Sequence, residues 1–595
     1  MNLDQLLREE VSQTVQQLFG QVPDNLALQP TNQEFEGSHT LVCFPLTRLS
    51  RKSPEETARL VGESLIGSSS VIERYNVVKG FLNLVLKDSV WISLLAEIVR
   101  EKNFGQLAAN GQEIMVEYSS PNTNKPLHLG HLRNNFLGYS VSEILKANGY
   151  TVHKVQIIND RGIHICKSMA AWKLYGDGET PFSSSMKGDH LVGKYYVEFD
   201  RAYKAQTRAL MEKGATQEEA EKDAPIMKLA QDMLRRWEQK DEDILSLWRT
   251  MNGWVYDGFA ETYKKMGVDF DKLYFESDTY LLGKEEVLKG VERGVFYRKE
   301  DGSIWVDLTA DGLDQKVLLR SDGTSVYMTQ DIGTAILRFR DFPGITGQIY
   351  TVGNEQEYHF KVLFLILDKL GYEWAKHCYH LSYGMVDLPT GKMKSREGTV
   401  VDADDLIQEM DQEAERQTKE LGKLEDMSSD EARQLFHMVG LGALKFFLLK
   451  VDPKKRMLFD PNESIQLQGF TGPFIQYTHA RIKAILRKAE SLGIIADAEA
   501  FATVKKLEPA ETEGVKLLSM FENKIREAGR DYSPAVIANY AYELAKAYNQ
   551  FYQSIPIFSE TNSDKLALRI AFSSAIGSAI KKSMQLLGID VPERM

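Results

Sequence analysis

The sequence predicts a multidomain α/β protein in which a central parallel sheet is flanked by a small α+β domain and a C-terminal helical bundle. Its length of 595 residues corresponds to about three to five domains. In the middle of the chain, apolar segments typical of strands alternate with amphipathic helices, and the strand patterns stop near residue 461. With 43% hydrophobic and 26% charged residues, the chain has the composition of a globular protein.

Residues 1–108 mix short strands with helices. Segments 40–44 and 81–86 are apolar and predict strands. Ser53 followed by Pro54 is typical of a helix start, because serine caps the first turn and proline suits its first position. We therefore expect a small α+β domain here.

Residues 109–460 show the alternation that predicts a parallel sheet with crossover helices. A charged, Glu- and Lys-rich stretch at about 167–267 interrupts it, and we interpret this stretch as a solvated helical insertion. The predicted strands are 114–118, 152–158 and 349–353, and predicted helices begin at His131 and Glu355.

Residues 461–595 carry long helical patterns, so we expect an α-helical bundle. The predicted helices are 474–492, 534–553 and 566–587.

Several classes of protein are disfavoured by composition. Apolar runs such as 362–367 are far shorter than the roughly 18 residues of a membrane span, and the first residues do not resemble a signal peptide. Cys43, Cys166 and Cys378 are isolated, which argues against a disulfide framework and against structural zinc. We expect a cytoplasmic protein that binds no membrane. The formal charge of −12 disfavours a nucleic-acid coat protein, although an acidic enzyme can hold RNA at local clusters of Lys and Arg.

A candidate nucleotide site lies where the strand at 113–118 leads through a loop into the next helix. His128 and His131 fall at the start of that helix, where free N–H groups and the helix dipole favour a phosphate. They could donate hydrogen bonds to an α-phosphate, and Gly130 would let an adenine ring approach the backbone. An isolated His pair is more often a pair of polar first-turn residues, so the flanking sequence decides.

A second candidate element is the Gly-flanked basic loop at 391–398, which follows the apolar segment 383–386. Its lysines and hydroxyls could close over the β- and γ-phosphates and stabilise departing pyrophosphate. A basic loop of this size is usually only solvated, and it gains meaning from the histidine element.

The pattern Pro-x-His-x-Gly-His after a strand resembles class I aminoacyl-tRNA synthetases, and other adenylyl transferases share a looser version. The remaining blocks narrow the resemblance to the arginyl-tRNA synthetase family over essentially the whole chain. These blocks are residues 116–122, 159–162, 320–331, 472–481 and 591–595. The resemblance implies a Rossmann-type catalytic domain, ATP as its Mg²⁺ complex, and L-arginine and tRNA(Arg) as substrates. The sequence itself shows no metal-ligand set.

For the nucleotide, the resemblance implies that His128, His131 and Lys125 are catalytic. The ATP-binding residues it implies are Asn124, Leu129, Gly130, Met385, Lys392, Met393, Lys394 and Ser395. The usual loop motif is Lys-Met-Ser-Lys-Ser, and the second lysine is missing from its slot here, where Arg396 ends the run. Our hypothesis is that Lys125 supplies the missing contact, with Lys394 as a lesser candidate.

For arginine, the resemblance implies that Glu117 and Asn122 hold the ammonium and carboxylate region. Tyr327 and Asp331 would hold the guanidinium, and Gln356 would line the same pocket. A guanidinium presents a planar fork of donors, which suits carboxylates. We expect Glu117 and Asp331 each at the end of a strand. The alternative for Asp331 is an N-cap of a helix at 332–339. Such a pocket rejects lysine by leaving acceptors unpaired, so no editing domain is expected.

For tRNA, the resemblance implies that the N-terminal domain meets the outer corner near the D-loop and that the helical domain reads the anticodon. Tyr477 and Met595 are its clearest tRNA-binding positions. Cationic residues after Tyr477 and the tyrosines of the helix at 534–553 suit loop bases, although a packed bundle explains much of the same pattern.

The resemblance also implies two steps, adenylate formation and transfer to a 2′-hydroxyl, with the first dependent on bound tRNA. We expect a monomer. The alternatives are another class I synthetase, a non-catalytic tRNA-binding paralogue, or an adenylyl transferase acting on a small metabolite.

Overall fold

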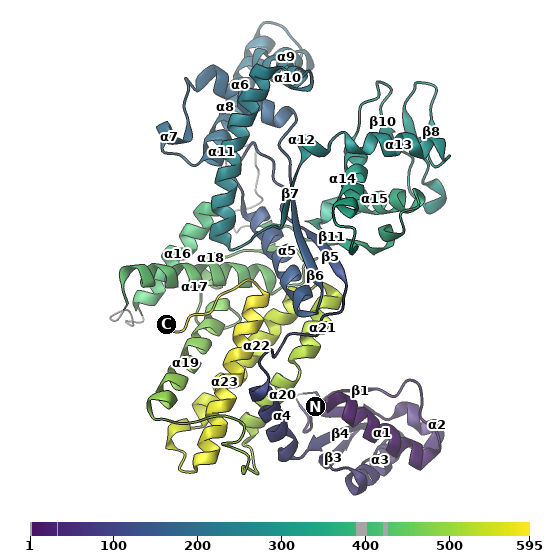
Figure 1. Ribbon diagram of the computed structural model, residues 1–595, viewed down its shortest axis with the longest axis vertical. Coiled ribbons are helices and arrows are strands. Elements are labelled where there is room, and N and C mark those ends of the chain that lie inside the picture. Colours follow the sequence, from purple (N-terminus) through teal and green to yellow (C-terminus); the bar gives the residue numbers. More distant parts are fainter. Residues whose placement is uncertain (1–2, 33, 388–400, 421–426) are drawn as a thin grey trace.

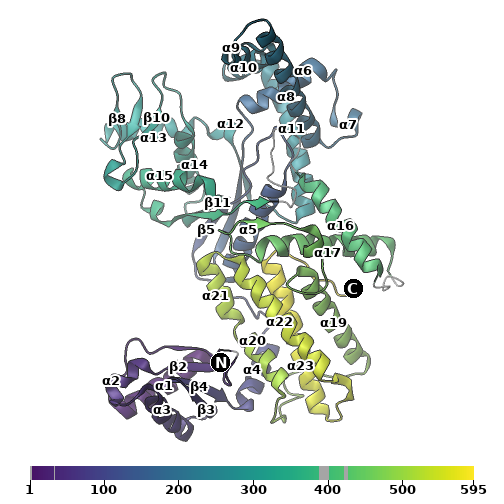
Figure 2. The ribbon, with the colours of Figure 1, turned by 180° about the vertical axis from the view of Figure 1, so that it is seen from behind.

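The computed structural model describes residues 3–32, 34–387, 401–420 and 427–595. The central sheet occupies the middle of the molecule, with a helical insertion at one end and the N-terminal domain at the other (Figure 1). The C-terminal helices α20 to α23 lie between the sheet and the N-terminal domain in both views (Figure 2). Predicted loop residues Lys392, Met393, Lys394 and Ser395 fall outside the described residues.

The N-terminal domain packs helices on a four-stranded antiparallel sheet of order β1-β2-β4-β3. The cap predicted at Ser53 is present, and it forms part of a capping box in which Glu56 N donates to Ser53 Oγ at 3.2 Å and Ser53 N donates to Glu56 at 3.2 Å. The strand predicted at 40–44 ends earlier, and a 3₁₀ turn containing Pro45 follows, because proline has no N–H to donate to a ladder. The elements are α1 (Leu3–Phe19), β1 (Leu28–Pro30), β2 (His39–Val42), α2 (Thr47–Ser50), α3 (Pro54–Ser68), β3 (Ile72–Val78), β4 (Phe81–Leu86) and α4 (Asp88–Arg100).

The central sheet has five parallel strands in the order β12-β11-β5-β6-β7, which confirms the predicted Rossmann-type architecture. The strands are β5 (Glu113–Glu117), β6 (Thr151–Ile158), β7 (Lys272–Phe275), β11 (Ile345–Gly353) and β12 (Cys378–Tyr383). Strand β5 has two neighbours in the sheet. The chain reaches one of them, β6, through α5 (Leu129–Ala147), and the other neighbour is β11. The strand order therefore reverses at β5, and ligands of such sheets bind outside the carboxyl ends at this switch point.

The insertion between β6 and β7 is helical (Figure 1). It comprises α6 (Ile163–Tyr175), α7 (Pro181–Ser184), α8 (Gly188–Glu212), α9 (Gln217–Asp223), α10 (Pro225–Glu238) and α11 (Glu242–Met266).

The part of the chain that runs from β7 to β12 builds a separate hydrophobic core. In it, helices pack with a small antiparallel sheet that the sequence patterns did not predict. Its strands have only two to four residues each, too few to show alternation. The elements are α12 (Glu276–Thr279), α13 (Leu282–Glu292), β8 (Tyr297–Arg298), β9 (Ile304–Val306), β10 (Lys316–Leu319), α14 (Tyr327–Asp341) and α15 (Glu357–Lys369).

The C-terminal part is helical, as predicted, and no helix of the described residues could cross a membrane. Tyr540 and Tyr548 are buried in its core, so the packed-bundle interpretation holds for these two tyrosines. Two short strands, β13 (Val386–Asp387) and β14 (Met457–Leu458), pair in parallel. The helices are α16 (Ala403–Glu420), α17 (Ser429–Leu449), α18 (Pro461–Ser464), α19 (Gly472–Ser491), α20 (Pro509–Ser519), α21 (Phe521–Asp531), α22 (Pro534–Ser554) and α23 (Ser563–Leu586).

Candidate active site

The two predicted histidines form one hydrogen-bonded unit at the start of α5. His128 is the N-cap, and its Nδ1 accepts from Gly130 N at 3.1 Å. His131 Nδ1 accepts from His128 N at 3.1 Å, and the ring centroids lie 3.9 Å apart. Because both Nδ1 atoms accept, each neutral ring carries its proton on Nε2. The pair therefore presents two Nε2–H donors at the carboxyl edge of the sheet.

Both imidazoles are neutral at ordinary pH. Burial, together with the charge of Lys125, lowers the pKa of His128 to about 4, while Asp402 opposes the shift. Burial also holds the pKa of His131 well below its usual range, with His128 and Lys125 contributing. The pair can thus stabilise growing negative charge as hydrogen-bond donors without a change of protonation state.

Gly130 permits this arrangement, since a Cβ there would lie 3.0 Å from His128 Cε1. The side chain of neighbouring Leu129 is fully buried in the main core. Leu129 therefore contributes only backbone to this surface, and its N donates to Val401 O at 3.3 Å.

The loop before the histidines has polar groups that find no partner among the described residues. The Oδ1 atom of buried Asn124 and the Oγ1 atom of buried Thr123 accept no hydrogen bond from any described residue. Burial lowers the pKa of Lys125, and the described residues provide no ion-pair partner for its ammonium group. Buried polar groups are normally satisfied, so these groups are suited to contacts with a bound ligand.

The remaining described ATP candidate, Met385, is 46% exposed beside β13. Its carbonyl accepts from Met457 N at 3.1 Å, which ties this segment to β14.

Glu117 ends β5 as predicted, but its carboxylate is committed to an ion pair with Arg338 of α14. Both side chains are buried. Burial raises the pKa of Glu117, and the Arg338 charge opposes that shift. Glu117 therefore lies beneath the carboxyl edge of the sheet with a protein cation already beside it.

Asp331 is neither at a strand end nor an N-cap, so both expectations for it were wrong. Helix α14 already begins at Tyr327, which places Asp331 one turn inside the helix. Its Oδ2 atom lies 2.6 Å from His359 Nε2. Tyr327 is 78% exposed and lies four residues earlier, so the two predicted guanidinium ligands share one helix face.

The other predicted arginine ligands are open to solvent. Gln356 is exposed in a 3₁₀ turn, Asn354–Gln356, directly after β11. Asn122 is exposed and forms an isolated parallel bridge with Asn159, beyond the ends of β5 and β6. Both therefore follow strands at the carboxyl edge.

Comparison with known proteins identifies the family. Residues 94–460 match the family of class I tRNA synthetases (R), catalytic domain, and residues 475–595 match the DALR anticodon binding domain. Proteins named arginine–tRNA ligase from Bacteroides thetaiotaomicron and Flavobacterium psychrophilum are 55% and 53% identical to this chain, with 100% of both chains covered. The chain belongs to the arginyl-tRNA synthetase family. An arginyl-tRNA synthetase from Thermus thermophilus has a similar structure, with a TM-score of 0.79, 25% identity and 100% of both chains covered.

The sequence patterns of this arginyl-tRNA synthetase family member did not single out Glu276 as a candidate site residue. Glu276 follows β7 directly, at the same sheet edge as Glu117. Burial is the largest cause that raises the pKa of Glu276 to about 7; Arg161 opposes the shift, and the charges of Asp160 and Asp331 contribute to it. Its position directly after an apolar strand was the signal that could have found it.

Arg161 supports Glu276 from the insertion side. Its guanidinium lies 3.9 Å from Glu276 and stacks 4.0 Å from the ring centroid of Tyr280. Asp160 accepts from Ser277 N at 2.9 Å and from Tyr256 at 2.9 Å, which fixes the start of α12.

The predicted tRNA-contacting residues lie in the C-terminal helical part. Tyr477 is on α19, with the Arg481 guanidinium 5.0 Å from its ring centroid. Met595 is half-buried. The segment before it runs along α19, where Pro592 O accepts a hydrogen bond from His479 at 2.9 Å.

Proposed function

We propose that this protein attaches L-arginine to tRNA(Arg) through an arginyl-adenylate, releasing AMP and pyrophosphate. The observation that carries the proposal is the pair of neutral imidazoles at the switch point of the sheet, whose Nε2–H groups donate to none of the described residues. The 55% identity to proteins named arginine–tRNA ligase supports arginine as the amino acid.

In the first step, an oxygen of the arginine carboxylate attacks the α-phosphorus of ATP. The new O–P bond forms as the bond to pyrophosphate breaks, and negative charge grows on the α-phosphate oxygens. His128 and His131 donate hydrogen bonds to that charge, and Lys125 adds a positive charge beside them. The proposal assigns nucleotide contacts also to Asn124, Leu129, Gly130, Met385, Lys392, Met393, Lys394 and Ser395.

Arginine recognition is assigned to groups at the carboxyl ends of β5, β7 and β11 and on α14. Asp331 and Glu276 would face the guanidinium, with Tyr327 and Gln356 at the pocket wall. Asn122, with Glu117 beneath it, would orient the ammonium and carboxylate. Two carboxylates placed around the planar guanidinium would reject cations that are shorter or that lack this fork of donors. When such a cation binds, carboxylate oxygens are left without a hydrogen-bond donor.

In the second step, the 2′-hydroxyl of the terminal adenosine attacks the arginyl carbonyl, and AMP leaves. We propose that activation requires bound tRNA, that the N-terminal domain meets the D-loop corner, and that the helical domain reads the anticodon through surfaces including Tyr477 and Met595. The match of residues 475–595 to an anticodon binding domain supports the last assignment.

We also propose three domains, at residues 1–108, 109–460 and 461–595. Mg²⁺ is assigned to the ATP phosphates rather than to a set of protein ligands. We further propose that the protein is a monomer and that it acts in the cytoplasm.

The test is aminoacylation of bulk tRNA with each amino acid in turn. We expect charging with arginine alone. Charging with a different amino acid would identify another class I synthetase, and tRNA binding without charging would identify a non-catalytic paralogue.

A further inference from the structure

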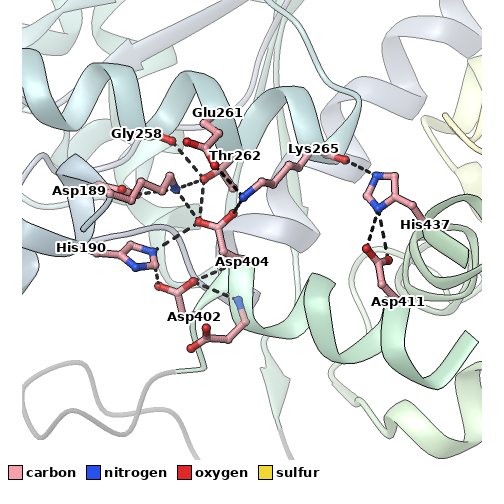
Figure 3. Close-up of polar contacts among 12 residues, drawn as sticks. Asp189, His190, Gly258, Glu261, Thr262, Lys265, Asp402, Asp404, Asp411 and His437 are labelled. Carbon is pink, nitrogen blue, oxygen red and sulfur yellow. Dashed lines mark hydrogen bonds and ion pairs between the residues drawn. The ribbon is translucent and has the colours of Figure 1, made fainter. Parts of the chain in front are cut away.

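A cluster of ion pairs joins the helical insertion to the start of α16 and contains none of the proposed substrate-binding residues (Figure 3). His190 of α8 lies between two carboxylates, with Nε2 at 3.2 Å from Asp402 Oδ2 and 3.4 Å from Asp404 Oδ2. Lys265 of α11 lies 3.3 Å from Asp404. The cluster therefore links three helices that are far apart in the sequence.

Lys187 supplies a further cation inside this cluster. Its ammonium contacts Asp404 at 2.5 Å and Asp189 at 3.1 Å. The ligand atoms of Asp189, His190 and Asp404 lie within 4.8 Å of one another, as in a metal site. Because Lys187 already balances these carboxylates, we interpret the group as an ion-pair network.

Close helix packing fixes the network in place. A Cβ at Gly258 of α11 would lie 2.3 Å from Asp189 Oδ1, and a Cβ at Gly188 would lie 2.0 Å from Trp254 O. Only glycine at both positions allows α8 and α11 to approach this closely. The start of α8 is therefore held rigidly against α11.

Asp402 connects this network to the histidine element. Its backbone forms an isolated bridge with His128, flanked by hydrogen bonds from Leu129 N to Val401 O and from Ala403 N to Leu127 O, the latter at 2.9 Å. Its side chain faces His190, and its Oδ1 atom accepts from Asp404 N at 2.8 Å. Asp402 therefore lies opposite His128 in this backbone bridge, and its carboxylate forms an ion pair with His190 of the insertion.

Helix α8 also touches the element directly. A Cβ at Gly193 would lie 2.8 Å from Pro126 Cδ and 3.6 Å from Lys125 Cα. His190 and Gly193 lie three residues apart on α8, so its first turns support the histidine element at two points.

We propose that His190 is a positioning residue for adenylate formation: by holding Asp402, it fixes His128 in the orientation that meets the α-phosphate. This inference rests on the proposed function. The two facing carboxylates raise the pKa of His190 to about 10, so the imidazolium persists through the working pH range. The same cation balances the Asp402 charge, which otherwise acts on His128.

The test compares His190→Gln with His190→Arg in ATP–pyrophosphate exchange in the presence of tRNA(Arg) and arginine. His190→Gln should displace His128, which acts on the transition state. We therefore expect kcat of the Gln variant to fall by roughly tenfold to a hundredfold. The KM for arginine should change less than about twofold, because Asp331 and Glu276 lie on other elements. Arginine can bridge both carboxylates, so His190→Arg should recover most of kcat.

The matched control is His164→Gln, which removes another histidine of the insertion, bonded to Tyr196 at 3.1 Å. All kcat values are taken per folded molecule, with the melting temperature measured for each variant. If His190→Gln fails to fold, Asp402→Asn replaces it, because Asn retains the cap of α16 and loses the charge.

Two outcomes would overturn the inference. One is unchanged kcat per folded molecule in the Gln variant, even with a lower melting temperature. The other is loss of kcat that His190→Arg does not recover. Wild-type protein that exchanges pyrophosphate with a different amino acid would instead refute the proposed function.

Discussion

The two sides of the switch point differ in how far they are formed before any ligand binds. On the nucleotide side, His128 and His131 are fixed by hydrogen bonds within a single helical turn. On the arginine side, the groups come from separate elements, and several are exposed or paired with other residues. Tyr327 is 78% exposed, and Asp331 is bonded to His359. We infer that the proposed phosphate site is preorganised by local backbone, whereas the proposed guanidinium site would be completed by its ligand.

The largest effect should follow from loss of a preformed donor. We expect His131→Ala to lower kcat of arginine-dependent pyrophosphate exchange by about 10²–10³-fold, because one donor to transition-state charge disappears. The KM for arginine should stay nearly constant. The control is His153→Gln on β6, whose ring lies 2.8 Å from Glu113 near the opposite edge of the sheet. Equal losses in both variants would show that the histidine element has no special role.

The next effect separates two lysines. We expect Lys125→Ala to lower kcat by about a hundredfold, because its ammonium lies beside the histidines and has no ion-pair partner among the described residues. Lys394→Ala should cost less. A near wild-type rate for Lys125→Ala together with an inactive Lys394→Ala would reverse the assignment.

On the arginine side the loss should appear in KM. We expect Asp331→Asn to raise the KM for arginine by about 30–100-fold, which corresponds to about 2–3 kcal/mol for one partner of a charge pair. Asp341→Asn, on the same helix and paired with Lys272 at 2.6 Å, is the matched control. A fall in kcat at constant KM would instead place Asp331 among the groups that act on the transition state. The proposed division between a nucleotide side and an arginine side would then be wrong.

The smallest effect concerns pH. Since burial raises the pKa of Glu276 to about 7, this carboxyl is partly protonated at neutral pH and must ionise to bind a guanidinium. The KM for arginine should therefore fall by up to about tenfold between roughly pH 6 and pH 8. In Glu276→Gln this dependence should flatten. A variant that keeps the wild-type pH profile would exclude Glu276 from recognition.

The sequence was most informative where structure is local. The cap at Ser53 and the strand-to-helix turn at the histidines are local features, and both were predicted correctly. The helix predicted to begin at His131 begins two residues earlier, at Leu129, with His128 as its N-cap. Asp331 was misplaced because no local pattern marks the start of α14 at Tyr327. The partners of His190 are brought together by the crossing of helices that are distant in the sequence, which no periodicity reveals.

The most direct test is a crystal structure with arginine and a non-hydrolysable ATP analogue bound. The account predicts both histidine Nε2 atoms about 3 Å from α-phosphate oxygens, with their rings unmoved, and the guanidinium between Asp331 and Glu276. An α-phosphate out of reach of both rings, or a guanidinium that contacts neither carboxylate, would contradict it.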